Sequence, residues 1–146
     1  ARHDLFPVGR LDIDTEGLLL ITNDGALAHD LLSPTKHVSK VYYAEIDGLI
    51  TEEDVNLFKN GVDIGEGKPT KPALLEILYQ GDNSKIRLTI TEGKFHQVKR
   101  MFEAVGKKVT YLKRVEMGTL VLPDDLAPGE YRPLTEPELQ RLRNVR

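Results

Sequence analysis

Two β-forming segments separated by a short turn constrain the fold of this chain more than any other feature. Residues 73–80 and 85–91 are rich in aliphatic side chains, and residues 86–90 alternate strictly between aliphatic and polar. Gly81-Asp82-Asn83 lie between the two segments, a composition typical of a turn. A period of two on either side of such a turn predicts a β-hairpin, and therefore an antiparallel pair of strands.

The rest of the chain contains further patterns of both kinds. Strands are expected at residues 18–22 (a buried apolar run), 40–47 and 109–117, and helices at 26–32, 51–61, 95–105 and after Thr135. Because the strands mostly follow one another through turns, the pattern favours an α+β fold with a mixed, largely antiparallel sheet flanked by helices. Residues 1–146 show no internal repeat and are expected to form one domain.

Several of these elements have recognisable ends and faces. Asn23 or Asp24 can accept hydrogen bonds from the free N–H groups of the first helix, and Pro34 forbids its continuation. Thr51 and Asp54 have the spacing of a capping box at the start of the second helix. Alternation puts Tyr42, Ala44 and Ile46 on one face of the strand at 40–47 and Val41, Tyr43 and Glu45 on the other. Residues expected to share one apolar face of the third helix are Phe95, Val98, Met101, Phe102 and Val105.

The composition excludes several classes of protein. The chain has no cysteine, which rules out disulfides, thiolate chemistry and zinc sites with sulfur ligands. No apolar run reaches the roughly 20 residues that a membrane-spanning helix needs, and no export signal is recognisable. We therefore expect a soluble, cytoplasmic protein with no membrane partner.

Charge is distributed unevenly along the chain. The formal net charge is −3, which by itself argues against a nucleic-acid-binding protein. Residues 45–84 contain nine acidic and three basic side chains, whereas residues 85–114 contain nine basic and two acidic ones. The second stretch is a candidate surface for a polyanion, although a charge run is more often only the solvated face of an element.

The densest group of reactive side chains lies between Gly9 and Gly17. The sequence GRLDIDTEG contains three carboxylates and one guanidinium, and glycine at both ends permits a tight backbone. A loop carboxylate such as Asp12 can act as a nucleophile or general base where a cation keeps it ionised, and Arg10 and the distant Lys99 are available. An isolated Asp-x-Asp is more often a turn that bonds its own backbone, so other motifs must decide.

One alternative is a metal-dependent phosphatase. Asp12-Ile13-Asp14-Thr15 partly matches the D-x-D-x-T nucleophile loop of haloacid-dehalogenase-type enzymes, and Asp124-Asp125 could imitate their later metal-binding acids. However, Thr15 directly follows Asp14, and Gly9-Arg10-Leu11 stands where that fold needs an apolar strand of a parallel sheet. The sequence therefore gives this reading little support.

A longer match indicates another family. The string GRLDIDTEGLLLITNDG resembles the signature of RsuA-type pseudouridine synthases, which modify bacterial ribosomal RNA. Two further blocks, Lys40-Val41-Tyr42 and residues 92–101, resemble the same family in the same order and spacing. The string LLSPTKHVSKVYYAEIDG is more similar to members that act on 16S RNA than to their large-subunit relatives.

The resemblance covers essentially the whole chain and implies its chemistry. In this family a uridine is flipped out of the RNA, its N1–C1′ bond is cleaved, and the base is rejoined to the sugar through C5. Nothing is added or lost, so neither a cofactor nor a metal is expected. Relatives normally begin with a small S4-type RNA-binding domain and a first catalytic strand, so residues 1–146 are expected to be an N-terminally truncated, monomeric catalytic domain.

Individual residues take roles by their place in these motifs. Asp12 is similar to the essential aspartate, which either attacks the sugar or removes its C2′ proton. Tyr42 resembles the tyrosine that stacks on the base and helps to remove the C5 proton, and Lys99 stands where many relatives carry an arginine that pairs with the aspartate. Asp14 and Thr15 are expected to form only local hydrogen bonds. RNA contacts are expected from Arg10, Lys40, Lys94, His96 and Arg100.

Two hypotheses from different classes therefore stand beside the phosphatase. One is an RNA uridine isomerase with a central active-site cleft, and the other is an RNA-binding module whose site has decayed, motivated by the missing binding domain and the negative net charge. The isomerase depends on one arrangement in space. The ammonium of Lys99 must lie against the carboxylate of Asp12, beside a base-sized gap covered by an aromatic ring.

Overall fold

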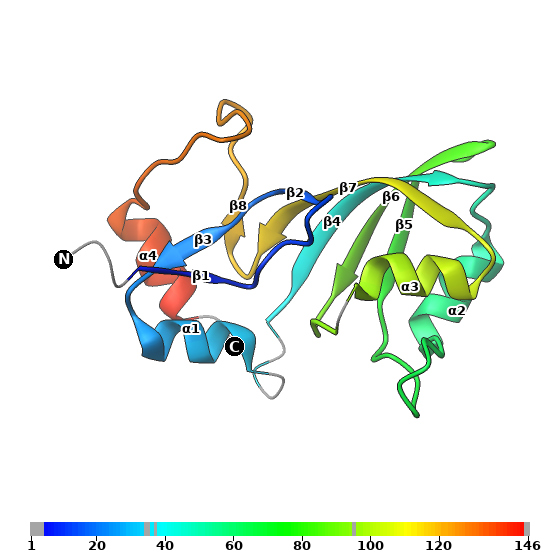
Figure 1. Ribbon diagram of the computed structural model, residues 1–146, viewed down its shortest axis with the longest axis horizontal. Coiled ribbons are helices and arrows are strands. Elements are labelled where there is room, and N and C mark those ends of the chain that lie inside the picture. The colour runs from blue at the N-terminus through cyan, green and yellow to red at the C-terminus, as the bar shows by residue number, and fades with distance from the viewer. Residues whose placement is uncertain (1–4, 34–35, 37, 95, 145–146) are drawn as a thin grey trace.

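The computed structural model describes residues 5–33, 36, 38–94 and 96–144. Its elements are β1 (Phe6–Val8), β2 (Glu16–Gly17), β3 (Leu20–Thr22), α1 (Gly25–Leu32), β4 (Lys40–Asp47), α2 (Glu52–Asn60), β5 (Leu74–Tyr79), β6 (Asn83–Ile90), α3 (Gln97–Ala104), β7 (Lys108–Met117), β8 (Leu120–Val121) and α4 (Glu136–Arg143). The six-stranded main sheet has the order β2-β7-β4-β6-β5, with β8 paired to β7, and β1 and β3 form a separate pair (Figure 1). Among the described strands only β2 and β7 pair in parallel, so the α+β, largely antiparallel expectation is confirmed.

The predicted hairpin and the strand at 40–47 form the middle of the main sheet. β5 and β6 pair antiparallel, and β4 pairs in unbroken register with β6, from Lys40 opposite Ile90 to Asp47 opposite Asn83. The alternation along β4 turns Ala44 and Ile46 into the core, with no exposed surface, and Tyr42 packs on the edge of that core. The prediction that Tyr42, Ala44 and Ile46 share a face is therefore confirmed, and this face is the inner one.

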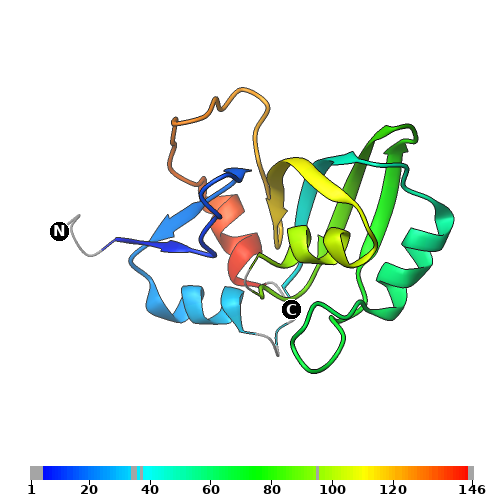
Figure 2. The same cartoon turned by 45° about the vertical axis from the view of Figure 1, so that its right-hand side comes forward.

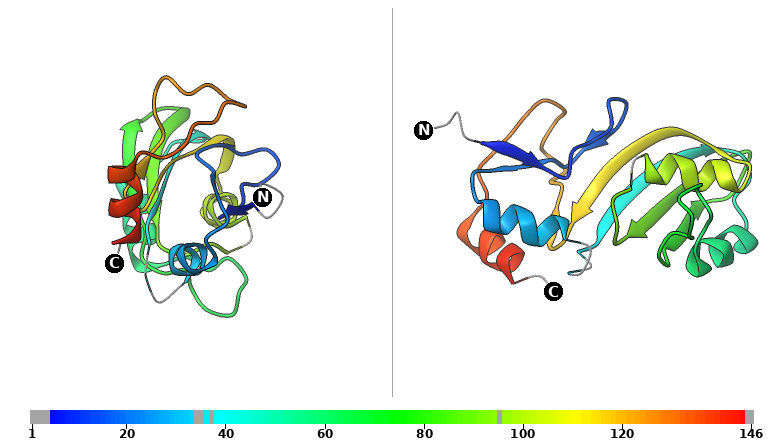
Figure 3. Two further views of the ribbon diagram at one scale, coloured as in Figure 1. Left: turned by 90° about the vertical axis from the view of Figure 1, so that its left-hand side faces the viewer. Right: turned by 60° about the horizontal axis from the view of Figure 1, so that its bottom comes forward.

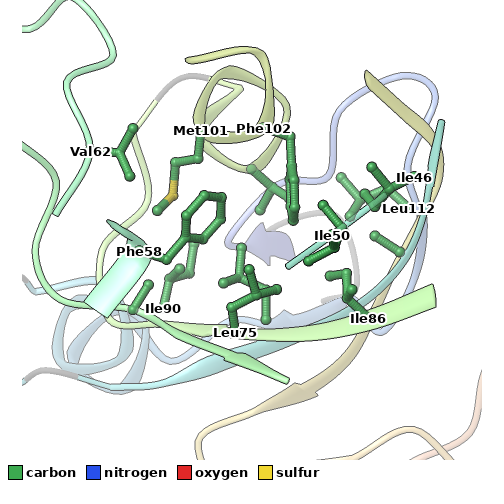
Figure 4. Packing of buried hydrophobic residues seen from close by; sticks show 14 of the residues in the cluster. Ile46, Ile50, Phe58, Val62, Leu75, Ile86, Ile90, Met101, Phe102 and Leu112 are labelled. Carbon is green, nitrogen blue, oxygen red and sulfur yellow. The ribbon is translucent and has the colours of Figure 1, made fainter. Parts of the chain in front are cut away.

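Helices α2 and α3 cover this inner face of the sheet (Figure 2). Their apolar residues meet the strands in one cluster, where Phe58 and Phe102 lie with ring centroids 4.9 Å apart (Figure 4). α2 begins at Thr51 with the predicted capping box to Asp54. The helix ends because Gly61 adopts a φ of 96°, which a side chain would disfavour.

A second hydrophobic cluster lies at the other end of the molecule. It joins β1, β3, α1 and α4 through residues that include Val8, Leu20, Leu31 and Leu142. Figure 3 shows α1 and α4 at the end away from α2 and α3. The molecule therefore has two hydrophobic cores connected through the main sheet.

The structure changes some predicted boundaries. The run 18–22 is not one buried strand, because only Leu18 and Leu20 are buried while Leu19 and Ile21 are exposed. The strand β3 within it pairs only with β1, so its outer face has no covering layer. Asp24, rather than Asn23, caps α1. The predicted stop of α1 at Pro34 and the apolar position at Phe95 lie outside the described residues.

In the described part of the chain, no helix combines the length and the apolar character needed to cross a membrane.

Candidate active site in the central cleft

A cleft with a volume of about 1110 Å³ lies where the two cores meet. One wall comes from the β1–β2 loop and the end of α1, and the other from the start of β4, the 68–71 segment and the 90–98 segment. Segments far apart in sequence therefore contribute to one site, as expected for a central active-site cleft.

The cleft is positively charged although the whole chain carries a net charge of −3. Its described lining contains two carboxylates, Asp12 and Glu92, and six basic side chains, Arg10, Lys40, Lys68, Lys71, Lys94 and Arg114. A concave surface with an excess of one charge concentrates ligands of the opposite charge. The cleft is therefore suited to a polyanion.

The basic stretch at 85–114 contributes only part of its charge to the cleft. Arg87 pairs with Glu116, and Arg100 pairs with Glu66. Lys107 lies 3.9 Å from the Asp54 carboxylate. These pairs neutralise part of the charge of the stretch. Lys94 and Arg114 of the same stretch line the cleft, together with Lys68 and Lys71 from the stretch that looked acidic.

Asp12 lies on the loop between β1 and β2, which is held at both ends. The Arg114 guanidinium donates hydrogen bonds to the carbonyl oxygens of Gly9 and Leu18. The Leu18 N–H donates to the Arg114 carbonyl at 2.8 Å, and the Thr15 N–H donates to the Asp12 carbonyl at 2.9 Å. Gly17 has a φ of 115°, and a Cβ there would lie 2.2 Å from the Arg114 oxygen, so only glycine allows this close packing.

The Asp12 carboxylate faces a lysine and a histidine from the start of α3. Lys99 Nζ lies 3.8 Å from Oδ2, and His96 Nε2 lies 3.6 Å from Oδ1. Both separations are too long for hydrogen bonds but short enough for a direct electrostatic interaction. The Asp12 side chain is 28% exposed, so its oxygens remain open to a ligand in the cleft.

Lys99 also pairs with Asp14, more closely than with Asp12. The hydrogen bond from Lys99 holds the pKa of Asp14 below its ordinary value. The expectation of local hydrogen bonds is met by the Thr15 N–H, which donates to the Asp12 carbonyl, but it is wrong for the Asp14 side chain, which pairs with Lys99. Asp14 reaches across to α3, and the buried Thr15 hydroxyl has no hydrogen-bond partner among the described residues.

His96 owes its position to an unusual backbone at the start of α3. It caps the helix with a φ of 49°, the only positive φ among the described non-glycine residues, and its side chain makes no capping hydrogen bond. The preceding segment is fixed because Gln97 receives a hydrogen bond from the Lys94 N–H and donates one to Glu92. The imidazole is thereby directed toward Asp12. The sequence predicted His96 only as an RNA contact, whereas the structure places it beside the candidate catalytic residue.

The structure separates the two adjacent tyrosines of β4. Tyr42 lines the cleft, whereas Tyr43 belongs to the opposite face of the strand and lies against Tyr111. Burial, together with a hydrogen bond to Glu45, raises the pKa of Tyr43 to about 12. Tyr42 is therefore the candidate for stacking on a base.

The predicted RNA contacts do not all reach the cleft. Arg10, Lys40, Lys94 and His96 line it. Arg100 does not, because its guanidinium donates to the Ile64 carbonyl and to the Glu66 carboxylate.

Arg114 is a site residue that sequence reasoning missed. It is 1% exposed, lines the cleft and stands opposite Tyr42 in the β4–β7 register. Alternation along the strand could have indicated it, because Arg114 lies two residues after Leu112 and therefore points to the same, inward face of β7. An arginine at such a position needs partners that a local pattern does not reveal.

The structure does not fit the phosphatase alternative. Within the described residues no three carboxylate or imidazole side chains gather closely enough to hold a metal ion. The sheet next to Asp12 is largely antiparallel, whereas that enzyme class needs a parallel sheet.

Comparisons with known proteins agree with the motif resemblance. The model of the RNA pseudouridylate synthase family matches residues 1–104. The chain is 56% identical over 142 residues to an uncharacterized RNA pseudouridine synthase of Bacillus subtilis, covering 97% of this chain and 59% of that protein. It is 47% identical over 136 residues to the ribosomal small subunit pseudouridine synthase A of Escherichia coli, covering 92% of this chain and 58% of that protein.

A solved structure supports the same relationship in three dimensions. A crystal structure of a pseudouridylate synthase superimposes with a TM-score of 0.91 at 45% identity, covering 96% of this chain and 60% of that chain. The chain therefore spans about three fifths of the length of the relatives that it matches.

Proposed function

Because this chain belongs to the RNA pseudouridylate synthase family, we propose that it isomerises a uridine of small-subunit ribosomal RNA to pseudouridine. The observation that carries the proposal is the Asp12 carboxylate, which is open to a positively charged cleft and flanked by Lys99 and His96. The similarity to ribosomal small subunit enzymes of several bacteria favours 16S RNA as the substrate.

The reaction exchanges one glycosidic bond for another. Asp12 either attacks C1′ to form an ester that C5 later displaces, or removes the C2′ proton and returns it to C2′ when C5 attaches; in both routes the N1–C1′ bond breaks. The freed uracil turns within the cleft, C5 bonds to C1′, and the C5 proton leaves while N1 becomes protonated. Atoms and electrons balance without an added oxidant, reductant or metal, so no cofactor is required.

The neighbouring residues support this chemistry through charge and shape. Lys99 Nζ, 3.8 Å from Asp12, brings a positive charge close to the carboxylate that would face the sugar. The ring of Tyr42 provides a surface on which the flipped uracil can stack, and stacking of this kind contributes about 1–3 kcal/mol per base. Tyr42 is also placed to help remove the C5 proton.

Other basic residues provide contacts to the RNA backbone. Arg10 and Lys94 belong to the rim of the cleft. We assign Arg100 a supporting role, because it holds the 64–66 segment against α3. We expect the domain to act as a monomer in the cytoplasm, where ribosomal RNA is assembled.

The decisive experiment measures loss of hydrogen from C5. A small-subunit RNA transcript carrying tritium at C5 of uridine should release tritium with the unaltered chain and not with Asp12→Asn or Asp12→Ala. Asp30→Asn, an exposed residue of α1, is the matched control and should keep full activity. Turnover by Asp12→Asn would refute the proposal, and RNA binding without tritium release by the unaltered chain would favour the inactive binding module.

A further inference from the structure

Lys40 is a buried cation without a partner. The residue is 7% exposed, yet its ammonium has no hydrogen-bond or ion-pair partner in the described part of the chain. It lines the cleft at the start of β4, on the same face as Tyr42. The backbone at Gly93 passes beside it, since a Cβ on that glycine would lie 3.7 Å from Nζ. Burying an ammonium in this way is costly unless a ligand compensates it.

Arg114 is a second buried cation on the same wall. Nε and Nη2 donate to the Leu18 and Gly9 carbonyl oxygens, while Nη1 has no hydrogen-bond partner among the residues placed in the structure. No carboxylate of the described chain forms an ion pair with this guanidinium. Backbone carbonyls satisfy donors but leave the positive charge uncompensated.

The two cations act on one another without compensation from the protein. Burial first, and the like charge of Arg114 second, lower the pKa of Lys40. The acidic residues of the cleft are engaged elsewhere: Glu92 accepts from the Lys71 N–H and from Gln97, and Asp12 faces α3. Two unneutralised cations at the floor of an open cleft form a preorganised place for an anion.

We propose that Lys40 and Arg114 form a subsite that binds a phosphate group of the RNA backbone adjoining the flipped uridine. The inference rests on the proposed function for the identity of the ligand as RNA. Lys40 and Tyr42 are alternate residues of one strand, about 6.6 Å apart along its axis. A nucleotide whose base stacks on Tyr42 therefore presents its sugar to Asp12 and its phosphate to Lys40. Guanidinium and ammonium groups are the side chains that bind phosphate most strongly.

The test compares the binding of ligands with and without phosphate. Titration calorimetry of the chain with uridine, uridine 5′-monophosphate and uridine 3′-monophosphate should show that a monophosphate binds about 10- to 100-fold more tightly than uridine, the range expected for charge-assisted hydrogen bonds. The two monophosphates distinguish which side of the nucleotide faces Lys40. Inorganic phosphate should compete with the tighter one.

Variants locate the effect. Lys40→Met should lose most of the phosphate selectivity, because only Arg114 remains, whereas Lys40→Arg should keep more of it. Replacing a buried unpaired charge with an apolar side chain of similar length should not unfold the protein. Lys108→Met removes the same charge from an exposed position of β7 and should leave the selectivity unchanged. Equal binding of uridine and both monophosphates by the unaltered chain, or full selectivity in Lys40→Met, would overturn the proposal.

The binding test is separable from the test of the proposed function. Phosphate selectivity without tritium release from RNA would support the subsite and refute the isomerase. Tritium release without phosphate selectivity would support the isomerase and refute the subsite.

Discussion

Substitution of Gly17 by alanine tests whether the packing of the Asp12 loop against β7 controls the reaction. The new Cβ would lie 2.2 Å from the Arg114 carbonyl oxygen and 2.6 Å from its amide nitrogen, at a φ of 115°. Both contacts are with backbone, so a rotamer change cannot relieve them. The loop must therefore move away from β7.

The structure gives the size of the expected effect. A side chain in this region of φ costs about 1–3 kcal/mol. Loss of the 2.8 Å hydrogen bond from the Leu18 N–H to the Arg114 carbonyl leaves buried groups unsatisfied, which costs about 1–3 kcal/mol more. We expect the free energy of unfolding to fall by about 2–6 kcal/mol. A displacement of Asp12 by about 1 Å should lower kcat by about 100-fold.

Urea denaturation and tritium release measure the two effects. Gly25→Ala is the matched control, because no atom lies within 4 Å of a Cβ at that position and its φ is not positive. It should leave stability unchanged or raise it by about 0.4–1 kcal/mol. If Gly17→Ala unfolds at the same urea concentration as the unaltered chain and keeps its kcat, the argument from backbone packing is wrong.

Three further predictions concern the core, the charge cluster and the last helix. Phe58→Ala should lower the free energy of unfolding by about 3–5 kcal/mol, because Phe58 is fully buried against Phe102, while Leu57→Ala at a half-exposed neighbour should change it by less than about 1 kcal/mol in the same urea assay. Lys99→Met should raise the pKa of Asp14 toward its ordinary value, followed by carboxyl carbon NMR, and an unchanged titration would show that Lys99 does not cause the shift. Arg132 and the Thr135 cap lower the pKa of Glu138 to about 2. The contribution of the ionised Glu138 carboxylate to the stability of the folded state is therefore complete above pH 4.5 and is lost as the pH falls toward 2. The protection factors of the α4 amides, corrected for intrinsic exchange at each pH, should fall over that window in the unaltered chain. Glu138→Gln should abolish this fall, whereas Glu136→Gln should not.

Sequence patterns predicted the elements that local chemistry determines. The strand β4 has the predicted bounds, and α2 has the predicted capping box, because alternation and capping act over a few residues. The short strands β1 and β8 were missed. Each consists of two or three residues whose pairing depends on a distant partner, so no periodic pattern could form.

Some residues of the candidate site could also be predicted from the sequence, and others could not. The motifs identified Asp12, Tyr42 and Lys99 as candidates, and the structure brings Lys99 within 3.8 Å of Asp12. Local reasoning did not predict which basic residues of the 85–114 stretch are neutralised, because pairs such as Arg100 with Glu66 are distant in sequence. It also missed Arg114, since burial of a charged side chain is a property of the folded molecule.

The presence of two separate cores has a consequence for substrate choice. Asp12 is attached to the core formed by β1, β3, α1 and α4, whereas Lys99 and His96 are attached through α3 to the other. A ligand that touches both walls restrains their spacing, and so uses its own binding energy to align the carboxylate with the sugar. A long, structured RNA should therefore react far faster than a mononucleoside, even though the bond that breaks is identical.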